Sequence, residues 1–176
     1  YGHHLPMRIR LLTLALAVLA YTSIAFAQTA DKPVPPAHEP HLAALEWMTH
    51  GTWHAEFTTP EGKPFVIDNE IRWSETGTSI VFTTHFNGRV NYFGIYVWDP
   101  QKQKLRFFYT SANGEFTEGE ATASPEGLLQ NFTISSAKGV EKLHSTVMRK
   151  GENQYDFAVF EDGSTKPEVA LTYTRK

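Results

Sequence analysis

From residue 52 to the end of the chain, apolar and polar residues alternate in short segments separated by turn residues. In the first segment Trp53, Ala55 and Phe57 fall on one face, opposite Thr52 and His54. A period of two residues is that of a half-buried β-strand. The pattern predicts ten strands, at residues 52–59, 65–73, 79–86, 90–98, 104–110, 115–123, 128–135, 140–149, 154–160 and 168–174.

The connections between these segments are short and rich in turn residues. Asn87-Gly88 and Asn113-Gly114 are the clearest, because Asn-Gly between alternating segments is a strong hairpin signal. Hairpins join each strand to the next, and a long meander removes its unpaired edges by closing on itself. We therefore predict an all-β fold, a ten-stranded antiparallel up-and-down β-barrel.

A short helix is expected just before the first strand, at residues 41–49. Leu42, Leu45 and Met48 recur at helical spacing and would face inward. Pro40 suits a first-turn position, and Gly51 suits the end of the element. We expect this helix to lie at the closed end of the barrel.

The first forty residues have a different organisation. Residues 1–6 precede Met7 and are interpreted as upstream sequence. Residues 7–27 have the pattern of a bacterial-type signal peptide: Arg8 and Arg10, an apolar run at 11–20, and a small-x-small cleavage site ending at Ala27. The apolar run is shorter than the roughly 20 residues of a membrane span. We expect a periplasmic or secreted protein without a span after cleavage, a Pro-rich linker at 28–40 and a barrel at 41–176.

Composition narrows the range of partners and of chemistry. The formal net charge is −3 and no cluster of Lys and Arg is present, which argues against a nucleic-acid partner. The chain has no Cys, which excludes a disulfide and a thiol nucleophile. The histidines of residues 38–54 match no zinc-site spacing, and no metal site is expected.

The aromatic content of 13% is high, which suits both strands and the lining of an apolar cavity. A ten-stranded barrel is usually too wide for its own side chains to fill. We expect a cavity for a small hydrophobic or amphipathic molecule. The candidate ligand-binding residues are Tyr92, Tyr96, Phe107 and Tyr109 on two adjacent strands, with Trp73, Phe82 and Tyr155 elsewhere.

Three residues are candidates for catalysis if the cavity is an active site. His85 precedes the Asn87-Gly88 turn, and His144 lies mid-strand with the parity of Val140 and Met148, so both are candidate acid-base groups. Glu118 shares a strand face with Glu120, which invites comparison with paired-carboxylate hydrolysis. For each of these residues we favour the simpler interpretation, an outward or satisfied His or a solvated acidic strand face.

The sequence around the first and last strands resembles a known superfamily. Gly51-Thr-Trp53 after a short helix, with Arg175 in the last strand, is similar to the lipocalin/fatty-acid-binding (calycin) barrels. The resemblance implies that Gly51, Trp53 and Arg175 form the barrel closure, with the guanidinium stacked on the indole. Within that superfamily, the phrase Leu45-Glu-Trp-Met-Thr-His-Gly-Thr-Trp53 resembles exported bacterial proteins of unknown function with DUF1579-like or nitrobindin-like barrels.

Nitrobindin-like relatives bind haem through a His near the C-terminus. This chain has no His after His144, so neither haem nor another cofactor is expected.

Three hypotheses of function follow. The first is a binding module that holds a small apolar or amphipathic ligand. The second is an enzyme, a hydrolase or isomerase, that uses His144, His85 or Glu118 in the cavity. The third is a protein-interaction module that docks a partner on segment 90–98, which is apolar on both faces. A homodimer is one arrangement left open.

Overall fold

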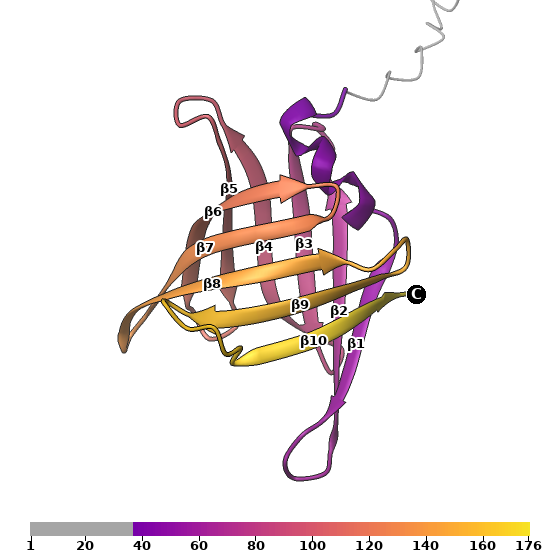
Figure 1. Ribbon diagram of the computed structural model, residues 1–176, viewed down its shortest axis with the longest axis vertical. Helices are drawn as coiled ribbons and strands as arrows, with labels where there is room; N and C mark the ends of the chain where they lie inside the picture. The colour runs from indigo at the N-terminus through magenta and orange to yellow at the C-terminus, as the bar shows by residue number, and fades with distance from the viewer. Residues whose placement is uncertain (1–36) are drawn as a thin grey trace, which may run out of the picture. The chain divides into compact units, whose positions relative to one another are not determined.

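Ten antiparallel strands close into a barrel in the computed structural model, which describes residues 37–176 (Figure 1). The strands follow chain order around the barrel, and β10 pairs with β1. The all-β class and the closed ten-stranded antiparallel barrel are therefore confirmed. The predicted signal peptide at 7–27, residues 1–6 and the linker residues 28–36 lie outside the described residues.

The strands agree with the predicted segments to within about one residue at each end. They are β1 Thr52–Thr58, β2 Pro64–Trp73, β3 Ser79–Phe86, β4 Arg89–Asp99, β5 Lys104–Ser111, β6 Phe116–Ser124, β7 Gly127–Ser136, β8 Gly139–Arg149, β9 Gln154–Glu161 and β10 Val169–Arg175. At the turn between β3 and β4, Asn87 and Gly88 both adopt positive φ, as a tight hairpin requires.

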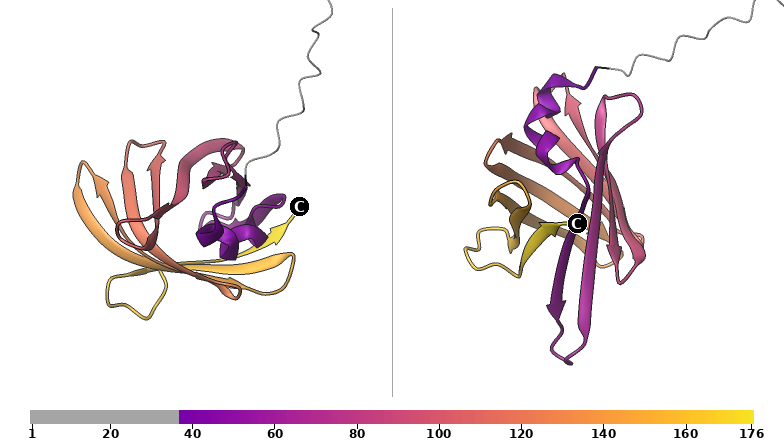
Figure 2. Two further views of the ribbon diagram at one scale, coloured as in Figure 1. Left: turned by 90° about the horizontal axis from the view of Figure 1, so that it is seen from above. Right: turned by 90° about the vertical axis from the view of Figure 1, so that its right-hand side faces the viewer.

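A 3₁₀ helix, η1 (Pro40–Met48), precedes the first strand and lies across one end of the barrel (Figure 2). Its first turn is capped by Glu39, whose carboxylate accepts from the backbone N–H of His41. Its inner side chains are buried in the barrel core: Leu42, Leu45, Trp47 and Met48. No helix within residues 37–176 is long and apolar enough to cross a membrane.

One aromatic contact and one hydrogen bond attach η1 to the barrel rim. The His41 ring stacks on Trp98 of β4, with 4.0 Å between the ring centroids. The indole Nε1 of Trp73, at the end of β2, donates to the Glu46 carboxylate over 2.7 Å. This end of the barrel is therefore a floor held by side chains from the helix and the strands.

The first and last strands meet at Trp53 and Arg175, as predicted. The two residues are register partners in the β1–β10 ladder, and the Arg175 guanidinium carbon lies 4.6 Å from the centroid of the Trp53 ring. Arg175 Nη2 also donates to the Trp47 carbonyl over 2.9 Å. Gly51, at φ 85°, leaves room for the arginine stem, since a Cβ there would lie 3.3 Å from Arg175 Cγ.

The ladder that closes the barrel is short. β1 pairs with β10 at two positions, Trp53 with Arg175 and His54 with Thr174, whereas it pairs with β2 at seven. The backbone N–H of Lys176 adds one more bond, to the Thr52 carbonyl. The seam is thus hydrogen-bonded at its floor end.

Replacing Arg175 by Met is expected to lower the free energy of unfolding by about 2–3 kcal/mol. The substitution removes a cation–π contact and a charged hydrogen bond to a backbone carbonyl. Urea unfolding followed by tryptophan fluorescence measures the change. Arg89→Met, at an exposed position in β4, is the control and should change stability by less than about 0.5 kcal/mol. Equal effects of the two substitutions would contradict the role assigned to Arg175.

Candidate functional site

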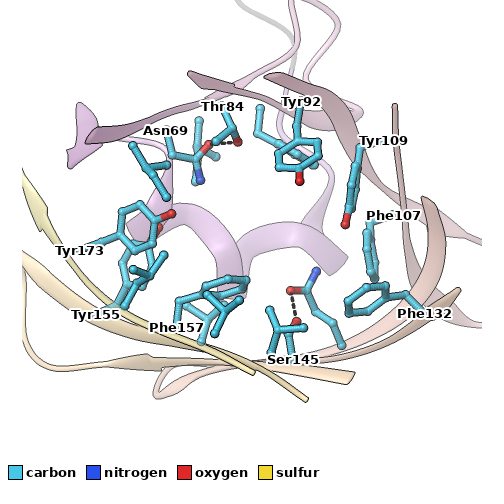
Figure 3. Close-up of a pocket in the computed structure, with 18 of the residues that line it drawn as sticks. Asn69, Thr84, Tyr92, Phe107, Tyr109, Phe132, Ser145, Tyr155, Phe157 and Tyr173 are labelled. Carbon is cyan, nitrogen blue, oxygen red and sulfur yellow. Dashed lines mark hydrogen bonds between the residues drawn. The ribbon is translucent and has the colours of Figure 1, made fainter. Parts of the chain in front are cut away.

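The inside of the barrel contains a cavity of about 370 Å³. Met48 of η1 is the helix residue that reaches it, and side chains from strands all around the barrel form its wall (Figure 3). Most of these side chains are aromatic or aliphatic. The lining residues are Met48, Ile67, Asn69, Ile71, Phe82, Thr84, Phe86, Tyr92, Tyr96, Phe107, Tyr109, Gln130, Phe132, Ile134, Leu143, Ser145, Val147, Tyr155, Phe157, Val159, Glu168, Val169, Leu171 and Tyr173.

The inner faces of the strands set this lining by simple alternation. On β3, Ile80, Phe82 and Thr84 are buried, while the residues between them are only partly covered. On β8, Ser145 and Val147 are buried in the same way. On each of these strands, every second side chain therefore points into the barrel.

Two inward-facing glycines shape the wall, and the sequence reasoning above did not single them out. A Cβ at Gly94 of β4 would lie 2.5 Å from Cζ of the Phe82 ring, and one at Gly119 of β6 would lie 2.8 Å from Cε1 of Phe107. Each glycine thus makes room for a ring to lie against the backbone of the neighbouring strand. A glycine inside a strand pattern is the sequence signal for such close approach.

Three polar side chains, from β4, β7 and β8, form a hydrogen-bonded cluster inside the barrel. Ser145 Oγ donates to Gln130 Oε1 over 2.8 Å, and Gln130 Nε2 donates to the Tyr96 hydroxyl over 3.1 Å. Their exposed fractions are 1% for Ser145, 6% for Gln130 and 8% for Tyr96. We call these three residues the inner polar cluster.

A second polar pair lies across the cavity from Ser145, as the labelled residues of Figure 3 show. Thr84 of β3 donates its hydroxyl to Asn69 Oδ1 of β2 over 3.2 Å. Neither this pair nor the inner polar cluster carries a charge. The polar groups of the pair and of the cluster are amides and hydroxyls.

Five tyrosines line the cavity, and burial is the main cause that raises their pKa values. Desolvation raises the pKa of Tyr109 to about 12, and it raises the pKa of Tyr92, Tyr96, Tyr155 and Tyr173 as well. All five stay as neutral phenols at neutral pH. Among the lining residues, which all belong to the described part of the chain, Glu168 is the one carboxylate and no Lys, Arg or His occurs.

Six of the seven candidate ligand-binding residues line this cavity. They are Tyr92, Tyr96, Phe107, Tyr109, Phe82 and Tyr155. Trp73 does not line it: its ring stacks on His38 and its indole donates to Glu46, so it belongs to the attachment of η1. A strand-end aromatic on the inner face can pack on the helix that closes the barrel instead of on the lumen.

The three candidate catalytic residues lie outside the cavity lining. His144 stacks on Phe160 of β9, on the face opposite Ser145 and Val147, so the inward orientation considered for it is wrong. Its parity partners Val140 and Met148 are themselves exposed. The parity of β3 likewise places His85 opposite Phe82 and Thr84. Glu118 pairs with Arg106 on the exposed side of the sheet.

The histidines near the N-terminus of the described chain lie beside acidic side chains, and His38 and His50 share Glu46. His54 contacts Asp68 over 2.8 Å, and His41 contacts Glu39. Within residues 37–176, no three His, Asp or Glu side chains are placed to hold a metal ion together.

The outer face of β4 exposes apolar side chains, as its sequence suggests. Phe93 is 53% exposed and Val90 is 55% exposed. Inner-facing Tyr92 and Tyr96 of the same strand line the cavity. The inner apolar residues of β4 therefore line the cavity, and its outer apolar residues form an exposed surface.

The fold and the cavity define a closed antiparallel barrel with an aromatic-lined interior. No family model matches the chain, and no curated protein matches it. Among solved structures, the chain is similar to the crystal structure of Rv2717c from M. tuberculosis. The TM-score is 0.49 at 14% identity, over 79% of this chain and 99% of that chain. A likeness at this level does not assign a family.

The tyrosines provide a test of the cavity in solution. In a chain begun at Gln28, the only tyrosines are the five that line the cavity. Their raised pKa values mean that the native state keeps phenol protons that the unfolded state loses above pH 10, so stability falls as pH rises from about 10 toward 12. Absorbance at 295 nm should stay flat to pH 10 and then rise together with unfolding, seen by circular dichroism. Ionisation of several tyrosines near pH 10 in the folded protein would contradict this burial.

Proposed function

We propose that this chain is a small-molecule-binding protein that holds an apolar or amphipathic ligand inside its barrel. The observation that carries the proposal is the cavity of about 370 Å³, enclosed by aromatic and aliphatic side chains with a few polar groups among them. This composition and size are typical of ligand pockets, in which apolar walls supply affinity and sparse polar groups fix orientation.

The proposal includes a relation to the lipocalin/fatty-acid-binding barrels, and within them to the DUF1579-like and nitrobindin-like proteins. Its support is the contact of Arg175 with Trp53 at the barrel floor. We further propose that the protein acts after export, in the periplasm or outside the cell, on the strength of the signal-peptide pattern at residues 7–27.

The cavity residues do not fit the haem of nitrobindin-like relatives. Haem iron is held by His, Cys, a Met–His pair or Tyr in proteins. The described lining contains no His or Cys, Met48 has no His partner there, and burial keeps the tyrosines protonated. The ligand that we propose is therefore an organic molecule held by contact and hydrogen bonding alone.

The candidate residues that suggested an enzyme lie outside the cavity. His85, His144 and Glu118 do not line the cavity, so none of them lies within hydrogen-bond reach of a molecule inside it. The interaction alternative retains the exposed Phe93 and Val90, but two side chains do not identify a partner.

Binding is tested with N-phenyl-1-naphthylamine, a neutral dye whose fluorescence rises in apolar surroundings. We expect saturable binding to the purified chain, together with a co-purified small molecule in native mass spectrometry. Leu171→Trp, which fills the cavity from β10, should weaken dye binding at least about tenfold, because overpacking removes the space that the ring needs.

The matched control is Thr172→Trp, one residue further along β10 on the exposed face. It should leave dye binding unchanged, and circular dichroism checks that both variants fold. A native protein that binds no dye and carries no small molecule would contradict the proposal. So would a Leu171→Trp variant that folds and binds the dye as well as the native chain.

A further inference from the structure

We propose that the cavity selects an uncharged ligand with a carbonyl oxygen, and that this oxygen is bound by the inner polar cluster of Tyr96, Gln130 and Ser145. The inference rests on the proposed function, because it names the ligand class of the same cavity. Two independent observations carry it: the charge of the lining and the count of hydrogen-bond donors in the cluster.

The charge of the lining disfavours an anionic ligand. A carboxylate or phosphate buried in this cavity would find no Lys, Arg or His among the lining residues of the described chain. Burying an unpaired charge is far more costly than burying a neutral polar group. The single ionised group of the lining, Glu168, is an exposed residue just before β10 and carries the same sign as such a ligand. A fatty-acid anion is therefore a poor occupant, although the walls suit its chain.

The inner polar cluster has more donor protons than the hydrogen bonds within it use. Ser145 and Tyr96 each carry one hydroxyl proton and the Gln130 amide carries two, which makes four donors. The two hydrogen bonds that join the three side chains use two of these protons. One amide proton and one hydroxyl proton remain, and within residues 37–176 neither of them is donated to an acceptor.

This count does not depend on how the Gln130 amide is oriented. With the amide turned over, Gln130 donates to Ser145 and Tyr96 donates to Gln130, so the free hydroxyl proton moves from Tyr96 to Ser145. In either orientation the cluster presents one amide donor and one hydroxyl donor. A carbonyl oxygen has two lone pairs and accepts both.

The position of the cluster makes this recognition selective. All three side chains are more than nine-tenths buried and line the cavity. A ligand without an acceptor would displace water from these donors and leave them unpaired, which is the costly case for buried polar groups. The aromatic walls, among them Phe107 and Phe132, then hold the apolar part of the ligand.

The test uses three naphthalenes that differ in one substituent: 2-acetylnaphthalene, 2-ethylnaphthalene and 2-naphthoate at pH 8. Each is titrated into the full chain by calorimetry and by displacement of N-phenyl-1-naphthylamine. The ketone should bind about five- to tenfold more tightly than the ethyl compound, the effect of one to two buried hydrogen bonds. The naphthoate anion should bind at least about a hundredfold more weakly than the ketone.

A variant with Tyr96→Phe, Gln130→Leu and Ser145→Ala removes every donor of the cluster while keeping the cavity apolar. Its dissociation constants for the ketone and for the ethyl compound should differ by less than about twofold, which means that the preference is lost. Thr84→Val removes a hydroxyl of the second polar pair and is the matched control. It should keep the preference.

Each result has a distinct meaning. If neither the dye nor any naphthalene binds, the proposed function fails. If the dye binds but naphthoate competes as well as the ketone, or the ethyl compound equals the ketone, the ligand class proposed here is wrong while the binding function stands. If Thr84→Val abolishes the preference and the triple variant keeps it, the assignment to the inner polar cluster is wrong. The ligand series on the native chain decides the class even if the triple variant does not fold.

Discussion

The contact between Arg175 and Trp53 is the constraint on which the barrel depends. Trp53 is fully buried, its indole Nε1 donates to the Met48 carbonyl, and the guanidinium of Arg175 covers its face. Helix, first strand and last strand therefore meet on one side chain. The chain has no cysteine, so this meeting of distant segments is held entirely by packing and hydrogen bonds.

The cavity is a consequence of that closure. Ten strands around one axis enclose more volume than their inner side chains fill, and the helix covers one end. Gly94 and Gly119 let two aromatic rings lie against the wall, so that the aromatic content of the chain lines the lumen without occupying all of it. The amides and hydroxyls among these rings are the polar part of what a ligand meets.

The sequence determined the strands well and the site unevenly. Alternation and turn residues located all ten strands, and Gly51, Trp53 and Arg175 located the closure. Six of the seven aromatic residues named from the sequence also line the cavity. Strand parity failed at His144 because β8 has apolar residues on both faces, with polar Ser145 facing inward and apolar Met148 facing outward. In the inner polar cluster, Gln130 and Ser145 are register partners on β7 and β8, whereas Tyr96 reaches Gln130 from β4, which is separated from β7 by two strands. No local sequence pattern reveals a contact of that kind.

The short seam between β1 and β10 divides the barrel wall into a fixed end and a loose end. At the floor the two strands share a ladder, while toward the mouth β1 continues along β2 beyond its last ladder partner in β10. That part of β1 has a ladder partner on one side only, and a strand edge that is paired on one side is held less firmly than one paired on both. We expect the wall to widen along this line while the rest of the barrel keeps its register. Under the proposed binding function, a ligand larger than the barrel mouth would enter through this seam rather than through the mouth alone.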